Sequence, residues 1–364
     1  MHWLNSIIGG FSQLFTFVNR DYRSSRLCLW VCGPEEIFYP MNSYSWLQQK
    51  LHQLALSSQF MRETTFDVES SITTAEQETD NHVFVAGLAR AGTTALLNAI
   101  YESNQFSSLS YQDMPFILAP NLWSKVSIAK QNGEFIERAH GDGIKVSSTS
   151  PEAFEEVFWM TFDERDYTTK EKFKLYVELI NRKYQKKRYL SKNNQNIKRL
   201  ELISDMFQGS KILVPFRNPI QHSYSLLSQH QLFLDRSKND AFISKYLRWI
   251  GHTEFGPNYI PVYDENLSFR DHLDINHWLE QWLLTYQHCY THLKHRNNIY
   301  FICYEKLCSS EDYWIDILKL LNVEKLYVFE FKESHKTIPI DINKGIVEKA
   351  SSLYSKLYDC SILN

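Results

Sequence analysis

Residues 83 to 94 constrain the fold of this chain more than any other stretch. They read Val-Phe-Val-Ala-Gly-Leu-Ala-Arg-Ala-Gly-Thr-Thr, which is an apolar run followed by a glycine-punctuated turn. The apolar run predicts a buried strand, and residues 94 to 100 after the turn predict a helix. A strand, loop and helix in this order point successive backbone N–H groups into one concavity at the positive end of the helix. The stretch therefore predicts a phosphate-binding loop.

The spacing of Gly87 and Gly92 matches the first six positions of an ATP-binding P-loop, which continues with Lys and then Ser or Thr. Here Thr93 and Thr94 follow the second glycine, and the only cation of the loop is Arg90, which precedes the turn. The displaced cation disfavours a kinase or ATPase and favours a different phosphate ligand. The structural alternative is an ordinary strand-to-helix turn with a chance glycine spacing.

A second candidate phosphate site follows another apolar run, Lys-Ile-Leu-Val-Pro-Phe at residues 211 to 216, which predicts a buried strand. Arg217-Asn218-Pro219 comes directly after it, and Ser225 follows within a predicted helix. An arginine at a strand end and a serine about two turns into the next helix can converge on one phosphate. The structural alternative is a surface salt bridge for Arg217 and a solvated helix face for Ser225.

The two elements together resemble the sulfotransferase family, which uses 3′-phosphoadenosine 5′-phosphosulfate (PAPS). In that family the first loop, commonly Pro-Lys/Arg-Ser-Gly-Thr-Thr, holds the 5′-phosphosulfate. The resemblance assigns this role to Ala89, Arg90, Ala91, Gly92, Thr93 and Thr94, with alanine in place of the usual proline and serine. The second element holds the 3′-phosphate, and the spacing of Arg217 and Ser225 fits it.

Further segments resemble a bacterial, carbohydrate-type branch of the family, and the resemblance spans about residues 80 to 330. These segments are 140–144, 150–156, 189–194 with 199–200, 252–256 and 303–307. The resemblance places Lys192 and Arg199 at the cofactor, although most of the basic residues between 182 and 199 read as a solvated helix face followed by a loop. It implies a sulfotransferase with PAPS as cofactor, PAP as product, no metal, and an acceptor hydroxyl on a saccharide or glycolipid.

In-line transfer of a sulfuryl group requires positive charge at the leaving phosphate, which the resemblance assigns to Arg90, and a base for the acceptor proton. Asp113 is the first candidate base, because it lies near the position where the tyrosylprotein branch keeps a catalytic glutamate. His140 is the second, because histidine needs little tuning, and Glu152 and Glu155 follow. Each of them also has a structural alternative as a cap, a loop hydrogen-bonder or a favourable charge at a helix N-terminus.

Strands that alternate with helices predict a three-layer α/β/α fold with a central parallel sheet and a ligand at the carboxyl ends of the strands. A third strand is expected at 299–304, and helices are expected at 151–162, 170–188 and 272–294. We expect residues 80–364 to form this α/β domain. Residues 1–79 are expected to be an N-terminal extension that packs on or flanks the core, joined through the polar run 70–81.

The composition narrows the classes of partner. A formal charge of −3 disfavours nucleic-acid binding, and no apolar run is long enough for a membrane span. The aromatic and aliphatic N-terminus can lie on a membrane surface, but it is not rich in Lys or Arg, so packing against the domain is favoured. Six cysteines without zinc-type spacing predict a reduced, cytoplasmic protein with no metal site.

Two alternatives of other classes stay open at this point. A kinase with a degenerate P-loop predicts magnesium-dependent binding of ATP. A catalytically silent protein that kept the fold predicts tight binding of PAP without turnover of any acceptor.

Overall fold

The computed structural model describes residues 46–72, 79–127, 136–137, 145–146, 149–239, 241–333, 336–338 and 341–361. The chain divides into two compact units. The first, which we call the helical unit, comprises Met1–Glu76, Leu109–Ser150 and Val157–Lys183. The second, the sheet unit, comprises Gln77–Ser108, Pro151–Glu156 and Tyr184–Asn364. The first boundary between the two units, between Glu76 and Gln77, falls in the polar run 70–81. The helical unit also includes residues 109–150 and 157–183, which we expected to belong to the α/β domain.

The sheet unit contains a five-stranded parallel sheet in the order β2-β5-β1-β6-β7. The strands are β1 (Val83–Val85), β2 (Phe106–Ser107), β5 (Arg188–Lys192), β6 (Lys211–Phe216) and β7 (Ile299–Cys303). The central strand β1 is fully buried, and Val83 lies opposite both Leu190 of β5 and Lys211 of β6. Burial on both faces explains why β1 and β6 read as continuous apolar runs rather than as alternating patterns.

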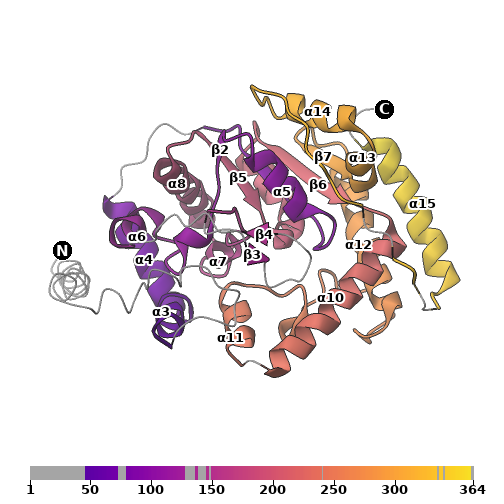
Figure 1. Cartoon of the computed structure of the whole chain (residues 1–364), viewed down its shortest axis with the longest axis horizontal. Helices are drawn as coiled ribbons and strands as arrows, with labels where there is room; N and C mark the ends of the chain where they lie inside the picture. The colour runs from indigo at the N-terminus through magenta and orange to yellow at the C-terminus, as the bar shows by residue number, and fades with distance from the viewer. Residues whose placement is uncertain are drawn as a thin grey trace. The chain divides into compact units, whose positions relative to one another are not determined.

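Helices cover both faces of this sheet, as the prediction of a three-layer fold requires (Figure 1). On one face Val83 and Val85 join a buried cluster with residues of α5 (Thr93–Tyr101) and α14 (Glu311–Leu320). On the other, the Phe84 ring lies 5.5 Å from Phe207, and the Phe216 ring lies 6.4 Å from Tyr286 of α12 (Ile275–Leu293). The three-layer α/β/α fold is therefore confirmed.

The remaining helices of the sheet unit surround these layers, and α10, α12 and α15 pack against one another. They are η3 (Asn194–Lys198), α9 (Leu200–Met206), α10 (Pro219–Asn239), α11 (Ala241–Trp249), η4 (Gly256–Asn258), α13 (Tyr304–Ser309) and α15 (Lys344–Cys360). Within the described residues, no helix is both long enough and apolar enough to cross a bilayer.

The helical unit is built from helices and one pair of two-residue antiparallel strands. These are α3 (Trp46–Leu56), α4 (Gln59–Ile72), η2 (Tyr111–Asp113), α6 (Pro120–Val126), α7 (Glu156–Trp159), α8 (Tyr167–Tyr184) and the antiparallel strands β3 (Ile136–Glu137) and β4 (Lys145–Val146). Its core includes the Phe66 ring of α4, which lies 6.0 Å from Phe158 and 6.3 Å from Tyr176. The first residue of α7, Glu156, and the last residue of α8, Tyr184, are counted in the sheet unit.

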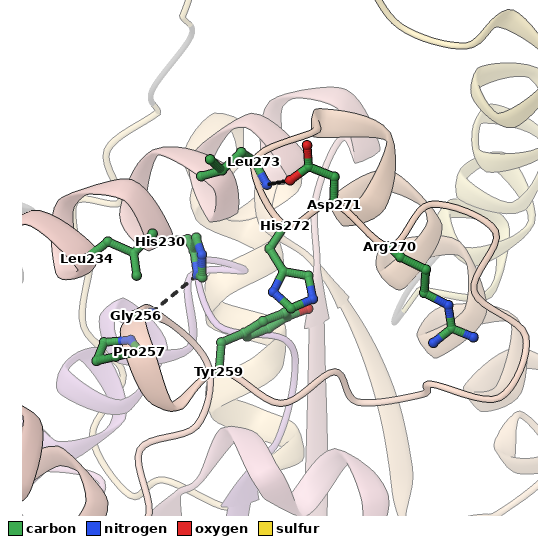
Figure 2. A pocket seen from close by; sticks show the side chains of 9 residues that line it. All are labelled: His230, Leu234, Gly256, Pro257, Tyr259, Arg270, Asp271, His272 and Leu273. Atoms are coloured by element: carbon green, nitrogen blue, oxygen red, sulfur yellow. Dashed lines mark hydrogen bonds between the residues drawn. The ribbon is translucent and has the colours of Figure 1, made fainter.

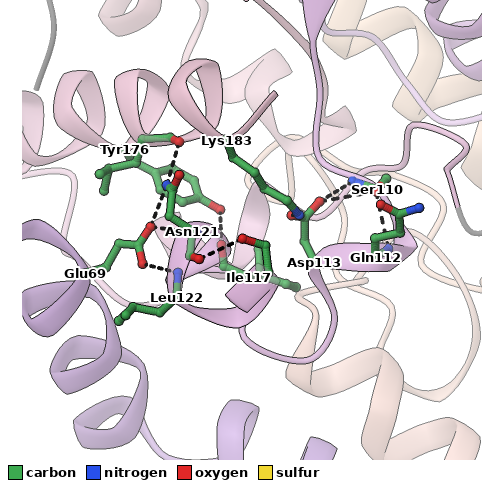
Figure 3. A network of polar contacts seen from close by, with 11 residues as sticks. Glu69, Ser110, Gln112, Asp113, Ile117, Asn121, Leu122, Tyr176 and Lys183 are labelled. Atoms are coloured by element: carbon green, nitrogen blue, oxygen red, sulfur yellow. Dashed lines mark hydrogen bonds and ion pairs between the residues drawn. The ribbon is translucent and has the colours of Figure 1, made fainter. Parts of the chain in front are cut away.

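A buried carboxylate fastens α4 to α6 within the helical unit. Glu69 is fully buried and accepts hydrogen bonds from the backbone N–H groups of Asn121, at 2.8 Å, and Leu122, at 2.9 Å (Figure 3). Because these groups lie in the first turn of α6, they have no partner within the helix, and the carboxylate also complements the helix dipole. Asn121 Nδ2 donates to the same carboxylate at 2.7 Å and to the Leu179 carbonyl oxygen of α8 at 2.9 Å.

Two of the predicted helices differ from the structure. The expected helix at 151–162 is only four residues long, α7, and Pro151 forms an isolated β-bridge instead of belonging to the helix. The helix expected at 170–188 ends at Tyr184, and β5 begins at Arg188. The sequence pattern hides β5 because its buried core, Tyr189 to Ser191, is short and flanked by basic residues. Pairing with β1 and β2, rather than local propensity, stabilises this strand.

Candidate active site

The predicted phosphate loop connects β1 to α5 in the sheet unit. Two of its residues have positive φ angles, Arg90 at 69° and Gly92 at 89°. Gly92 is the N-cap of α5 in the left-handed conformation, and no side chain caps this end of the nine-residue helix. Thr93 and Thr94 occupy the first turn and are buried, as are Ala89 and Ala91. This geometry leaves the helix N-terminus to receive an anion.

Arg90 connects the first element to the second. Its side-chain Nε donates to Ser225 Oγ at 3.2 Å, although the two residues are 135 positions apart in the chain. Ser225 lies on α10, which follows β6. The two segments that the sequence predicts to bind phosphate therefore meet in one place.

Arg217 follows the last residue of β6, and its guanidinium carbon lies 5.8 Å from the centre of the Tyr304 ring. Tyr304 begins α13 directly after β7, the neighbouring strand. The same ring packs against the phosphate loop, because a Cβ atom added at Gly92 would lie 2.2 Å from Tyr304 Cδ2. Arg217 and the loop thus share one aromatic neighbour at the carboxyl edge of the sheet.

Glu305, the residue after Tyr304, holds the turn that carries Arg217. Its Oε1 accepts a hydrogen bond of 2.7 Å from the backbone N–H of Asn218. The Asn218 side chain in turn accepts from the backbone N–H groups of Ile220 and Gln221, both at 3.1 Å, and so caps the start of α10. Sequence reasoning assigns no role to Tyr304 or Glu305, although both lie in the segment 303–307 that carries part of the family resemblance and both follow a buried strand directly.

His222 is a further residue that sequence reasoning missed. It is fully buried on α10, and its Nε2 lies 2.8 Å from the Ala89 carbonyl oxygen. Because a carbonyl only accepts, Nε2 carries the proton and donates. Burial, together with a smaller effect of the nearby charges of Arg217 and Arg90, lowers the pKa of His222 to about 3. A neutral imidazole thus fastens the phosphate loop to α10, one turn before Ser225.

Lys192 and Arg199 flank the η3 segment beside the loop. Lys192 is the buried last residue of β5, where it lies opposite Val85 of β1. Thr93 Oγ1 donates to Asn194 Oδ1 at 3.2 Å, which brings η3 against the first turn of α5. Lys192 therefore lies at the carboxyl edge of the sheet, in the strand next to the one that enters the loop.

Arg199 forms a two-pronged ion pair with Glu156. Its Nη1 lies 2.8 Å from Oε2 and its Nη2 lies 2.9 Å from Oε1, and Asn193 Nδ2 donates to Oε2 at 2.8 Å. Burial raises the pKa of Glu156, while the charge of Arg199 opposes that shift. This geometry gives Arg199 a role in holding the η3 segment, and its predicted contact with the cofactor stays a prediction.

Asp113, the first candidate base, belongs to the helical unit and is fully buried there. Its Oδ2 accepts from the backbone N–H of Ser110 at 2.7 Å, which caps η2, and its Oδ1 forms an ion pair with Lys183 of α8 (Figure 3). The capping alternative is thus realised in the structure. A role as base is untested by this geometry and stays a prediction.

The other candidate bases fall into three different situations. Glu155 is buried and accepts from Tyr189 Oη at 3.0 Å, from Asn196 Nδ2 at 2.7 Å and from the Ser191 hydroxyl. Glu152 is buried, and its Oε1 accepts from the backbone N–H of Ala153 at 2.9 Å. His140 lies outside the described residues. Among the residues that the structure describes, no three His, Cys, Asp or Glu side chains are grouped so as to hold a metal ion.

Comparison with known families decides the identity of this fold. The model of a family described as the sulfotransferase family matches residues 82–323, about two thirds of the chain. This chain belongs to the sulfotransferase family. The match includes both predicted phosphate elements and the Tyr304–Glu305 pair of this sulfotransferase, and it confirms the resemblance drawn from the sequence.

Solved structures of three bacterial sulfotransferases are similar to this one. The one from Mycobacterium tuberculosis is 11% identical with a TM-score of 0.42, covering 88% of this chain and 82% of its own. The one from Mycobacterium avium is 12% identical with a TM-score of 0.40, covering 97% and 92%. The one from Alicyclobacillus acidocaldarius is 14% identical with a TM-score of 0.35, covering 78% and 94%. No protein with a curated description matches the chain.

Proposed function

We propose that this sulfotransferase transfers the sulfuryl group of PAPS to an acceptor hydroxyl on a saccharide or glycolipid. The observation that carries the proposal is the hydrogen bond between Arg90 and Ser225, because it joins the two predicted phosphate elements into one site. A donor with phosphate groups at both its 5′ and 3′ positions matches such a pair of elements better than ATP, which has no 3′-phosphate.

The residues present fit a bound phosphate group. The N-terminus of α5 has no side-chain cap, and the loop before it passes through two positive φ angles. Backbone N–H groups at such an end bind anions, and an arginine adds a planar set of donors. Arg90 and the first turn of α5 would hold the 5′ group, and Arg217 with Ser225 would hold the 3′-phosphate.

PAPS, when bound, supplies an activated sulfuryl group. Arg90 then stabilises the negative charge that develops on the leaving phosphate, and the hydroxyls of Thr93 and Thr94 add donors. We further propose Lys192, at the end of β5, as a second cation at this edge. Arginine stays charged at all relevant pH values, so Arg90 acts through charge and not as an acid.

The acceptor proton requires a base, for which Asp113, His140, Glu152 and Glu155 are the proposed candidates. The substitutions Asp113→Asn, His140→Gln, Glu152→Gln and Glu155→Gln separate them. Replacement of the base should abolish turnover with little change in the affinity for PAP. Replacement of a residue with a structural role should also lower the folding stability.

We also propose a reduced, cytoplasmic setting, which is supported by the free thiols of Cys289, Cys303, Cys308 and Cys360. Contact with a membrane surface through the apolar N-terminal segment stays a prediction, because that segment lies outside the described residues.

The decisive test is the thermal stabilisation of the full chain by PAP, compared with ADP and with ATP plus magnesium, because a ligand that binds only the folded state raises the melting temperature. We expect PAP to stabilise most. Arg217→Ala removes a charged hydrogen-bonding partner, which is worth about 1.5–3 kcal/mol, so the affinity for PAP should fall about tenfold to a hundredfold.

Arg296→Ala is the matched control for the loss of an arginine. Arg296 precedes β7, and because β6 and β7 are parallel it lies at the opposite edge of the sheet from Arg217, paired with Asp205 at 2.6 Å. This variant should keep its response to PAP. A response to ATP plus magnesium alone would instead favour the kinase.

Transfer itself is measured with labelled PAPS and a panel of saccharide and glycolipid acceptors. Loss of a donor that stabilises a developing charge commonly costs about 10²–10³ in turnover, so we expect a loss of this size for Arg90→Ala. Turnover near the wild-type rate in Arg90→Ala would refute its role at the leaving group. Tight binding of PAP without transfer to any acceptor would favour the catalytically silent protein.

A further inference from the structure

A cavity of about 480 Å³ opens in the sheet unit where α10, η4 and the loop before α12 meet (Figure 2). This volume is within the usual range of small-molecule sites, about 300–1,000 Å³. The lining residues that matter for its chemistry are His230, Leu234, Pro257, Tyr259, His272 and Leu273. None of the residues that we assign to the PAPS site lines this cavity.

The cavity and the PAPS site use different faces of α10. With 3.6 residues per turn, His230 and Leu234 project about 140° and about 180° away from the direction of Ser225. Both of them line the cavity, whereas Ser225 bonds to Arg90 of the phosphate loop. The cavity is therefore a second site on the opposite side of this helix.

Two successive hydrogen bonds determine the direction in which the Tyr259 hydroxyl donates its proton. His277 Nδ1 lies 2.7 Å from the Phe269 carbonyl oxygen, so Nδ1 carries the proton and donates. Burial lowers the pKa of His277, which favours the neutral ring, so its Nε2 accepts the hydroxyl proton of Tyr259 at 2.7 Å. The Tyr259 oxygen thus presents its remaining lone pairs as a fixed acceptor.

His230 provides a fixed donor beside that acceptor. The backbone N–H of Gly256 donates to His230 Nδ1 at 3.3 Å, so the proton of the neutral ring is on Nε2. His230 is buried, and this burial, followed by the neighbouring His272 and His277, lowers its pKa to about 4. At neutral pH the ring therefore offers one N–H and no charge.

Each charged residue at the cavity already has a polar partner. Arg270 forms an ion pair with Asp264, and in Figure 2 its side chain points away from Tyr259 and His272. Asp271 Oδ1 accepts from the backbone N–H of Leu273 at 2.9 Å. The cavity therefore lacks the unpaired cations that an anion requires, and a single carboxylate does not make a site for a divalent metal.

Rings and apolar side chains complete the walls. The rings of Tyr259 and His272 lie 4.8 Å apart at 82°, and Leu234, Pro257 and Leu273 add aliphatic surface. Fixed neutral donors and acceptors beside aromatic and aliphatic surface suit a ligand with hydroxyl edges and C–H faces, which is the chemistry of a pyranose ring. We propose that this cavity is a binding subsite for a neutral saccharide. Its use as an anchor for the acceptor glycan rests on the proposed function, whereas the binding itself does not.

The test applies the labelled full chain to an array of neutral, sulfated and sialylated glycans, followed by calorimetric titration of the strongest neutral ligand. We expect retention of neutral glycans by the wild type. We also expect about a tenfold loss of affinity in His272→Ala, which removes one ring from the wall. The matched control is His292→Ala, an exposed histidine near the end of α12, which should bind like the wild type.

The stabilisation by PAP is measured on the same three proteins. It should be equal in all of them, which shows that His272→Ala is folded and that the two sites are separate. Retention of anionic glycans only, retention of no glycan, or equal affinity in His272→Ala would each overturn the proposal. Retention of neutral glycans by a wild type that does not respond to PAP would leave the subsite standing and refute the PAPS-dependent function.

Discussion

Replacement of Gly92 by alanine should destabilise the sheet unit through two separate effects. The first is backbone strain, because Gly92 has a φ angle of 89° and a left-handed conformation costs a residue with a Cβ atom about 1–2 kcal/mol. The second is overlap, because the new Cβ atom would lie 2.2 Å from Tyr304 Cδ2 and 2.3 Å from Cε2. Such overpacking costs about 1–3 kcal/mol, so the free energy of unfolding should fall by about 2–5 kcal/mol in total.

The Tyr304 ring has little freedom to avoid this overlap. It is 8% exposed, its hydroxyl donates to the Lys332 carbonyl oxygen at 3.1 Å, and the Phe331 ring lies 6.3 Å away. The Arg217 guanidinium lies over the same ring. A displaced Tyr304 would therefore move a neighbour of the proposed 3′-phosphate site, so Gly92→Ala should also weaken the stabilisation by PAP.

Urea unfolding followed by tryptophan fluorescence measures the loss, with Gly345→Ala as the control. Gly345 lies in α15, has no positive φ, and its added Cβ would come within ordinary van der Waals distance of Asn343 Oδ1, at 3.4 Å. Alanine there should be neutral or stabilising by up to about 1 kcal/mol. Repeating Gly92→Ala in a Tyr304→Ala background should remove the overlap and leave the backbone strain. An equal loss in both backgrounds, or a loss below about 0.5 kcal/mol, would refute the proposed packing.

Two further predictions concern buried ionisable groups. His222 has a pKa of about 3 in the fold against an ordinary 6.5, so the unfolded chain binds more protons between these values and stability falls as the pH falls. Urea unfolding between pH 6.5 and 5 should show a slope that His222→Gln flattens by about 1.4 kcal/mol per pH unit, and an unchanged slope would contradict a buried neutral ring. Lys183→Met leaves the buried carboxylate of Asp113 without its charged partner and should cost about 3–5 kcal/mol in the same assay. Adding Asp113→Asn should recover part of that loss, and a further loss on this addition would argue against the pair.

The elements that the sequence predicts well are those whose signal is local. The runs that form β1, β6 and β7 are apolar because both faces of the sheet are covered, and the residues that follow β1 and β6 include glycine or proline. The predicted strand at 211–216 coincides with β6. The helix predicted at 272–294 is α12, which begins one residue after the Asp274 N-cap.

Other features depend on contacts between distant segments and leave no local signal. The strand β5 is stabilised by pairing with β1 on one side and β2 on the other, and its residues Tyr189 and Leu190 are buried. Glu156 holds Arg199 from 43 positions away, a pairing that no spacing rule anticipates. The Asp113 ion pair likewise depends on the position that α8 gives to Lys183.

Patterns of neighbouring residues predict the family, the parallel three-layer fold and the two segments proposed to bind phosphate, because strand, glycine turn and helix start are local features of the chain. How these elements meet depends on contacts between distant segments. The tertiary structure brought Arg90 to Ser225, placed Tyr304 between the loop and Arg217, and buried His222 as a neutral donor. The physical reason is that these contacts join the ends of different strands, and parallel pairing alone brings those ends to one edge of the sheet.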